Sequence, residues 1–210
     1  APGTTLNDVV VALCAGALRR RLKARGDLLT EPLVAAVPIS VRRSQDEEGN
    51  HISMMYVRIP TDEPDPQERL RRSREVMSAA KSVHGAVPAP VMQDAAFTTP
   101  PAMLGRAART MAVLGSNGWI DPPHNVTISN VPGWQAPMYC AGAKVIAQYP
   151  VNVLLDGMAA SLTFLSYMDH MDVGITTDRD NVPDVWELAQ DFGAELDEMA
   201  TRLSTAGHTK

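Results

Sequence analysis

A short strand that ends abruptly is the feature that most constrains the fold of this chain. Residues 125–133 read NVTISNVPG and begin by alternating apolar and hydroxylated side chains, the period-2 pattern of a half-buried strand. The closing proline-glycine pair removes a backbone donor and permits a turn. The alternation places Asn130 on the face of Val126 and Ile128, where a buried amide needs hydrogen-bond partners. Asn130 therefore either ties down the turn or is a polar group directed into a site at the end of the strand.

Two helix starts precede this strand. Thr5 and Asp8 have the spacing of a capping box, which predicts a helix from about residue 6 to residue 25. Gly26 is the residue type that ends helices. Asp65 is followed by a proline and then by Glu68, and this order predicts a second helix that runs to about residue 83.

Shorter patterns predict the other elements. Strands are expected at residues 33–41, 52–59, 138–153, 162–167 and 171–175, with an edge or bulge at Pro38, a break at Pro150 and a hairpin turn at Asp156-Gly157. Further helices are expected at 102–114 and, with the most regular apolar stripe, from 182 to 203, followed by a frayed tail from Ser204. Residues 85–118 are interrupted by prolines and form a mobile segment or a loosely packed crossover. The sequence thus predicts one α/β domain whose mixed sheet of five or six strands is flanked by three or four helices.

Two groups of arginines lie on the predicted helices. The first is Arg19, Arg20, Arg21 and Arg25 with Lys23, and the second is Arg69, Arg71, Arg72 and Arg74. Both groups have a structural explanation, as cations near a helix C-terminus and as the solvated outer face of a helix. The alternative is contact with phosphates of a ligand or with an anionic membrane surface, for which Arg19, Arg20, Arg21, Arg71 and Arg72 are the candidates.

The composition excludes several classes of function. A net charge of -5 over 210 residues gives no basic footprint for nucleic acid. Two cysteines form neither a disulfide framework nor a metal site. None of the five histidines stands in a recognisable catalytic or zinc motif. Without an apolar run long enough to span a membrane, a cytoplasmic protein is expected, with peripheral contact to a membrane or lipid droplet left open.

The first residues of the chain predict a fragment. Ala1 is not an initiating methionine, and a helix begins within five residues. We therefore expect residues 1–5 to be a linker remnant and the chain to be a piece of a longer protein.

Several motifs, taken in order, resemble the C-terminal half of the bacterial wax ester synthase/diacylglycerol acyltransferase family. The sequence carries Asn7-Asp8 at the opening of a helix, Val37-Pro38-Ile39-Ser40-Val41-Arg42, Gly49-Asn50, Asp65-Pro66, Ser129-Asn130-Val131-Pro132-Gly133, Asp156-Gly157, Ser166-Tyr167 and Val182-Pro183-Asp184. Asn-Asp alone is weak and Asn-Val-Pro-Gly is moderately specific, but the ordered set is strong. The resemblance covers essentially the whole chain.

The resemblance implies one half of a two-domain fold like that of chloramphenicol acetyltransferase, with a substrate tunnel between the halves. The family's catalytic His-His-x-x-x-Asp-Gly motif lies in the N-terminal half and is missing here, so no catalytic residue is expected in this chain. The implied reaction esterifies diacylglycerol or a long-chain alcohol with acyl-CoA, giving triacylglycerol or a wax ester, without a metal or other cofactor. The residues carried over as substrate-binding or site-supporting are Asn7, Asp8, Ser129, Asn130, Val131, Pro132 and Gly133.

The implied partners are acyl-CoA, the lipid acceptor and the protein's own N-terminal domain. An isolated half would expose the apolar surface made for that domain, which favours self-association. Two other functions remain open. One is half of a condensation-type transferase that takes substrates from carrier proteins, and the other is a non-catalytic lipid-binding module.

Overall fold

Five strands form one mixed sheet in the computed structural model, which describes residues 3–40, 52–86, 101–116, 124–154 and 158–207. The strands are β1 (Val34–Ser40), β2 (Ile52–Arg58), β3 (Val126–Val131), β6 (Ala160–Tyr167) and β7 (His170–Thr177). Their order across the sheet is β2-β1-β3-β6-β7. The three central strands β1, β3 and β6 run parallel, while β2 and β7 pair antiparallel with their neighbours at the two edges.

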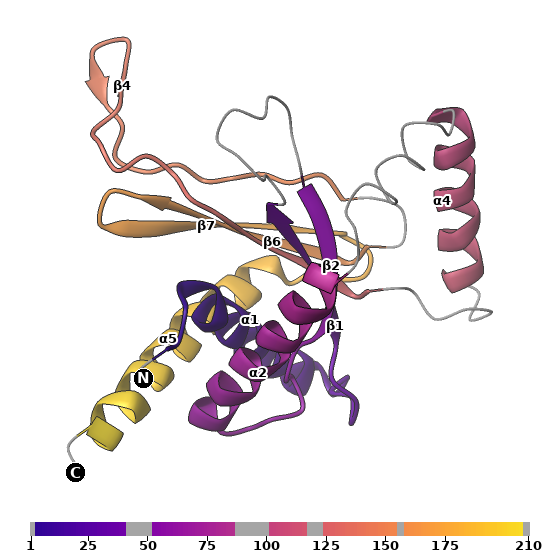
Figure 1. Cartoon of the computed structure of the whole chain (residues 1–210), viewed down its shortest axis with the longest axis horizontal. Coiled ribbons are helices and arrows are strands. Elements are labelled where there is room, and N and C mark those ends of the chain that lie inside the picture. Colours follow the sequence, from indigo (N-terminus) through magenta and orange to yellow (C-terminus); the bar gives the residue numbers. More distant parts are fainter. Residues whose placement is uncertain (1–2, 41–51, 87–100, 117–123, 155–157, 208–210) are drawn as a thin grey trace.

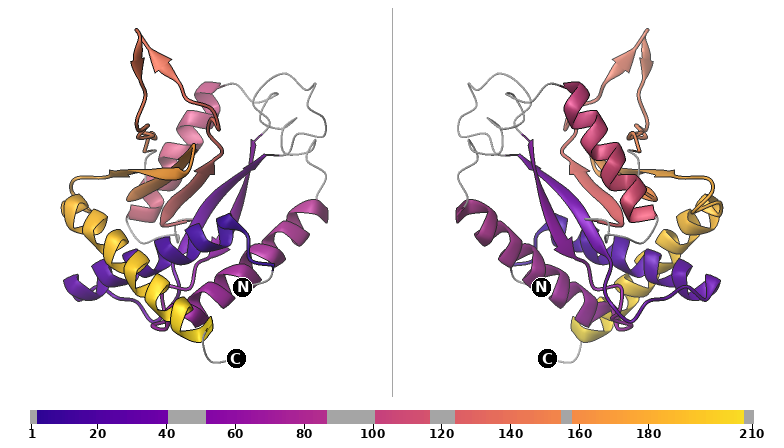
Figure 2. Two further views of the ribbon diagram at one scale, coloured as in Figure 1. Left: turned by 90° about the vertical axis from the view of Figure 1, so that its left-hand side faces the viewer. Right: turned by 90° about the vertical axis from the view of Figure 1, so that its right-hand side faces the viewer.

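Three helices gather on one side of this sheet, as Figures 1 and 2 show. They are α1 (Leu6–Arg25), α2 (Pro66–Ala86) and α5 (Val185–Gly207). Their apolar stripes pack with Val37, Val126, Leu162 and other inward side chains of all five strands into one hydrophobic cluster. The fourth described helix, α4 (Pro101–Ser116), stands apart at the right of Figure 1.

The predicted helix starts are confirmed by their caps. Thr5 donates its backbone N–H to the Asp8 carboxylate at 2.8 Å, and the Thr5 hydroxyl accepts the Asp8 N–H at 3.3 Å. Gly26 ends α1 with φ 78°, the left-handed conformation that favours glycine. At the start of α2, Asp65 accepts the N–H groups of Gln67 and Glu68 at 3.0 and 2.9 Å.

Residues 138–153 are less regular than the sequence predicts. They contain only the two-residue strands β4 (Tyr139–Cys140) and β5 (Ala143–Lys144), paired in a hairpin that projects from the body of the domain (Figure 1). We call residues 132–144 the arm. The chain then returns along the sheet as residues 145–154, an extended segment without a backbone ladder that we call the strip.

Four further predictions need correction or lie outside the described residues. The last helix, predicted to end at residue 203, continues to Gly207, and the rest of the predicted frayed tail lies outside the described residues. Pro38 is not on an edge strand of the sheet, because β1 lies between β2 and β3. However, β1 pairs with β3 only at Ala35 and Ala36, so at Pro38 itself the strand is paired on one side only, with β2. The hairpin turn at Asp156-Gly157 and the motif residues 41–50 lie outside the described residues.

Candidate functional site

The face of the sheet opposite the three helices, which we call the far face, is lined by hydroxyl groups. The register aligns one row across all five strands, consisting of Tyr56, Ala36, Thr127, Ser161 and Thr176. A second row joins Ser129, Thr163 and Gly174. The sheet is therefore apolar where it meets the helices and polar on its other face, which is the surface available for a functional site.

Two hydroxyls and one imidazole on this side are buried without hydrogen-bond partners among the described residues. They are Thr127 Oγ1, Thr163 Oγ1 and both ring nitrogens of His124. The His124 ring lies 5.6 Å from that of Tyr56, centroid to centroid. Burial lowers the pKa of His124 below its ordinary value of 6.5, so the imidazole is neutral at pH 7. These groups offer hydrogen bonds to an oxygen-bearing ligand.

The Asn-Val-Pro-Gly motif turns the chain from β3 into the arm. Gly133 lies against β6, where its N–H is donated to the Ser166 hydroxyl at 3.1 Å. A Cβ at Gly133 would overlap the Ser166 carbonyl oxygen and come within 3.1 Å of the Ser166 carbonyl carbon. The glycine of the motif thus has a structural cause, which is the close approach of two backbones.

The strip is fastened across the far face by polar contacts. The Tyr167 hydroxyl donates to the Val145 carbonyl at 3.1 Å and accepts the Met138 N–H at 2.9 Å. The Gln148 N–H is donated to Asp172 at 2.7 Å. Asn152 donates its side-chain amide to Ser161 at 3.1 Å, so the strip occupies part of the hydroxyl row.

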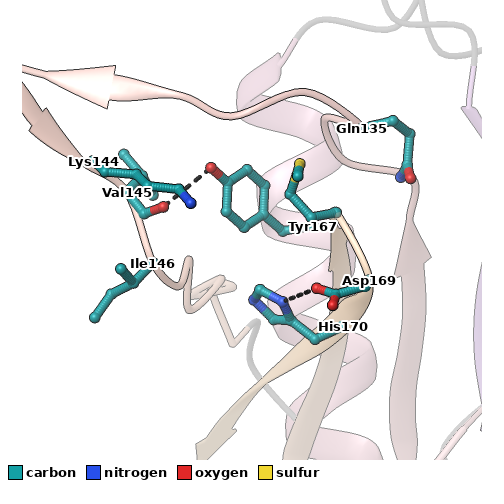
Figure 3. Close-up of a pocket in the computed structure, with 8 residues that line it drawn as sticks. Gln135, Lys144, Val145, Ile146, Tyr167, Asp169 and His170 are labelled. Carbon is teal, nitrogen blue, oxygen red and sulfur yellow. Dashed lines mark hydrogen bonds and ion pairs between the residues drawn. The ribbon is translucent and has the colours of Figure 1, made fainter.

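A pocket of about 450 Å³ opens where the arm joins the strip, as Figure 3 shows. Tyr167 forms its centre, with His170 and Asp169 on one side and Lys144 on the other. His170 Nδ1 lies 3.3 Å from the Asp169 carboxylate, and this hydrogen bond holds the pKa of Asp169 below its usual value. His170 Nε2 lies 3.6 Å from Asp172. The pocket therefore places a tyrosine ring beside an imidazole, a carboxylate and a lysine.

The structure separates the predicted site residues by face. Asn130 aligns with Phe164 and shares the parity of Val126 and Ile128, so it belongs to the helix-covered face at the end of β3. Its half-buried amide makes no hydrogen bond with the described part of the chain. Ser129 belongs to the far face, in register with Thr163. Asn7 and Asp8 lie in the first turn of α1, where Asp8 is engaged in the capping box. A substrate-binding role for these residues stays a prediction.

The candidate phosphate-binding arginines all have acidic or carbonyl partners within the chain. Arg19 donates to the carbonyls of Thr61 and Asp62 at 2.8 and 3.0 Å. The other pairs are Arg20 with Glu195 and Glu198, Arg21 with Asp184 and Asp191, Arg71 with Glu68 and Glu75, and Arg72 with Asp62 and Glu63. Partial burial favours the neutral form of Asp184, but the hydrogen bond from Arg21 keeps its pKa below the ordinary value. These pairs explain the arginines without a ligand, and phosphate contact stays a prediction.

The prediction that Arg69 lies on a solvated helix face is wrong, because the structure buries its side chain. Its side chain and that of Glu195 on α5 are both 2% exposed and form an ion pair. Arg69 also donates to the Glu63 carbonyl at 2.6 Å. One sign of this pair is present in the sequence. Glu195 is a charged residue between Phe192 and Met199 on the apolar stripe of α5, where a buried carboxylate needs a partner.

Two of the solved structures that this fold resembles are acyltransferases. The chain aligns with a wax ester synthase/diacylglycerol acyltransferase from Marinobacter aquaeolei VT8 at a TM-score of 0.70 and 29% identity, over 95% of this chain and 44% of that one. It also aligns with the acyl transferase PapA2 at a TM-score of 0.54 and 13% identity, over 94% of this chain and 39% of that one, a likeness of fold alone. The fold is thus one half of a two-domain architecture that occurs in acyltransferases, with a mixed sheet flanked by helices.

Sequence comparison defines the family. A profile of the WS/DGAT C-terminal domain matches residues 48–200, and the chain belongs to this family. It is 36% identical to a Mycobacterium tuberculosis protein named as a diacylglycerol O-acyltransferase, over 94% of this chain and 39% of the relative. It is 33% identical to the O-acyltransferase WSD of Acinetobacter baylyi, over 91% of this chain and 41% of the relative. The chain thus spans about two fifths of the length of these relatives.

Proposed function

We propose that this chain is the C-terminal domain of an acyl-CoA-dependent O-acyltransferase that esterifies diacylglycerol or a long-chain alcohol. The observation that carries this proposal is the family match over residues 48–200, supported by the TM-score of 0.70 to a wax ester synthase/diacylglycerol acyltransferase. The products are a triacylglycerol or wax ester and free CoA, and no metal or other cofactor takes part.

In the proposed reaction the acceptor hydroxyl attacks the thioester carbonyl of acyl-CoA. Its proton passes to a general base of the N-terminal domain, the new ester bond forms, and the thioester bond breaks to release CoA. We assign that base to the other domain and give no residue of this chain a catalytic role. Its role is to complete the substrate tunnel, for which the hydroxyl-lined far face supplies hydrogen-bonding groups opposite the helices.

The test is an assay of the full-length protein with a long-chain acyl-CoA and diacylglycerol or hexadecanol. We expect release of one CoA thiol per ester formed, and no turnover by the 210-residue chain alone, since the general base is supplied by the other domain.

We place the enzyme in the cytoplasm, in peripheral contact with a membrane or lipid droplet where its acceptor resides. Diacylglycerol presented in anionic vesicles tests that contact by co-sedimentation. Transfer only from acylated carrier protein would instead support the condensation-type alternative.

Asn130 is proposed as a polar contact at the end of β3, near the substrate tunnel but on the helix-covered side of the sheet. Its amide lacks a partner among the described residues although it is half-buried, a state that a substrate or a group of the other domain would relieve. We expect Asn130→Ala in the full-length enzyme to lower kcat/KM by about tenfold to a hundredfold while the melting temperature stays unchanged. Unchanged activity and stability would remove Asn130 from the site.

A further inference from the structure

Helix α4 differs in charge from the rest of the chain. Its sequence, PAMLGRAARTMAVLGS, contains two arginines and no acidic residue. The stretch without acidic residues is longer than the helix, because the nearest ones are Asp94 before it and Asp121 after it. The whole chain carries a net charge of -5, so α4 is a locally positive element of an acidic protein. Such an element is attracted to anionic surfaces.

The described side chains of α4 form two neighbouring stripes. Met103, Ala107 and Leu114 are separated by four and seven residues, so they share one apolar face of the helix. Arg106 and Arg109 lie three residues apart on an adjoining face. Met103 is 62% exposed, and Arg106, Ala107 and Arg109 are exposed as well. An apolar stripe beside a basic one is typical of a helix that lies in the plane of a membrane interface.

The position of α4 leaves both stripes accessible. Helices α1, α2 and α5 pack together beside the sheet, whereas α4 makes no extensive contact with another helix or strand among the described residues. Figures 1 and 2 show it apart from the other three helices. A stable amphipathic helix buries its apolar face against a partner, so we look for that partner outside the described part of the chain.

The composition of α4 favours a lipid surface over a protein as this partner. Protein interfaces are enriched in aromatic residues and depleted in alanine, whereas α4 has several alanines and no aromatic residue. With 16 residues, α4 is about 24 Å long, which is shorter than the hydrocarbon core of a bilayer. No helix in the described part of the chain is long and apolar enough to cross a membrane. A contact of α4 with lipid would therefore run along the surface.

We propose that α4 is the element through which the full-length enzyme binds an anionic lipid surface. Met103 and Ala107 enter the boundary of the acyl chains, and Arg106 and Arg109 lie at the lipid phosphates. The inference rests on the proposed function, because an enzyme that esterifies diacylglycerol or a long-chain alcohol takes its acceptor from a lipid phase. It assigns the lipid contact to α4 instead of to the arginine groups of α1 and α2, which are paired with acidic residues of the chain.

Co-sedimentation of the full-length protein with vesicles tests the two arginines. Arg106→Gln combined with Arg109→Gln removes both charges, and glutamine has nearly the helix propensity of arginine. We expect this double variant to bind vesicles of phosphatidylglycerol and phosphatidylcholine about thirtyfold more weakly than the unsubstituted protein, since each arginine near an anionic surface contributes about fivefold.

The matched control removes two exposed arginines elsewhere, by Arg179→Gln combined with Arg202→Gln. We expect this control to bind the same vesicles within about twofold of the unsubstituted protein, because salt screens charges that lie far from the contact. An equal loss in both double variants would show attraction through net charge alone and would overturn the inference. Unchanged binding of the α4 variant would overturn it as well.

A fluorescent label on the apolar stripe tests insertion directly, without altering the arginines. Met103→Cys is labelled with a nitrobenzoxadiazole dye in a Cys140→Ser background, and the same background without Met103→Cys is the blank, since Cys140 is an exposed thiol. We expect the dye emission to shift to the blue on addition of anionic vesicles and to be quenched by brominated lipids. A dye that stays unquenched, or that is already shielded before vesicles are added, would show that lipid does not cover α4 and would overturn the inference.

The acyltransfer assay on the same preparations separates the two proposals. Vesicle binding through α4 without turnover would refute the proposed function while the role of α4 stands. Turnover by a protein whose label at position 103 stays unquenched would refute the role of α4 alone.

Discussion

Replacing Glu195 by glutamine is expected to lower the free energy of unfolding by about 3 to 5 kcal/mol. Glu195 is the buried partner of Arg69 and also accepts a hydrogen bond from Arg20 Nε at 3.0 Å. The substitution keeps the shape of the side chain and removes its charge, so the Arg69 guanidinium stays buried without a counter-charge. Arg69 Nε already lacks a partner among the described residues, which leaves little to compensate the loss.

The position of Glu195 makes this pair important for the whole helical layer. Arg69 lies on α2 and Arg20 on α1, so one carboxylate on α5 joins all three helices. Gly16 on α1 allows this approach, because a Cβ there would run into the Glu195 side chain. Breaking a buried ion pair costs about 3 to 5 kcal/mol. A loss of that size is a large share of the free energy of unfolding of a typical domain.

Urea denaturation followed by far-UV circular dichroism measures the effect. The matched control is Glu198→Gln, one turn further along α5, which also pairs with Arg20 but is 36% exposed. We expect the control to change stability by less than about 1 kcal/mol, as is usual for exposed ion pairs. Equal midpoints for the two variants would show that the buried pair contributes no more than the exposed one.

The local signals in the sequence predict the helices well. The capping groups at Thr5, Asp8 and Asp65 act within three residues of their own positions, so a sequence pattern contains all that is needed to place them. The bounds of α1 agree with the prediction at both ends for this reason. The confirmed family membership likewise follows from motifs that can be recognised in order along the chain.

Long-range pairing could not be predicted in the same way. Helical spacing predicts which residues share a face with Arg69, but its partner Glu195 is 126 residues away in the sequence. Only the fold shows that α5 brings a carboxylate to that face. A buried arginine without such a partner would be too costly, which is why a solvated surface was the natural expectation from the sequence.

The strip shows a second limit of sequence patterns. Tyr149 to Val153 alternate as a strand would, and this alternation predicts a strand. Pro150 has no N–H to give to a ladder, and its neighbours Gln148 and Asn152 bond to side chains of the sheet instead. The alternation is real, but it separates a polar anchored side from an apolar exposed side. Which side faces the protein depends on the Ser161 and Tyr167 hydroxyls of β6 and the Asp172 carboxylate of β7. Only the folded sheet places these groups beside the strip.

Replacing Gly174 by alanine is expected to displace the strip and to lower the activity of the full-length enzyme by at least about tenfold. Gly174 faces the strip from β7, where an added Cβ would overlap the Pro150 carbonyl oxygen and lie 2.8 Å from its carbonyl carbon. A backbone carbonyl cannot move aside as a flexible side chain can, so the strip itself must shift. The expected cost in stability is about 1 to 3 kcal/mol, as for overpacking in other proteins.

Gly193→Ala is the matched control for this substitution. Gly193 lies inside α5, and a Cβ there would meet no heavy atom within 4 Å. Alanine favours the helix, so we expect this variant to gain about 0.5 to 1 kcal/mol and to keep full activity. If Gly174→Ala lowered activity while amide hydrogen exchange of residues 145–154 stayed as slow as in the unsubstituted protein, displacement of the strip would not be the cause. Faster exchange there together with lost activity would tie the anchored position of the strip to catalysis, since the substitution adds one methyl group at a single contact between the strip and the sheet.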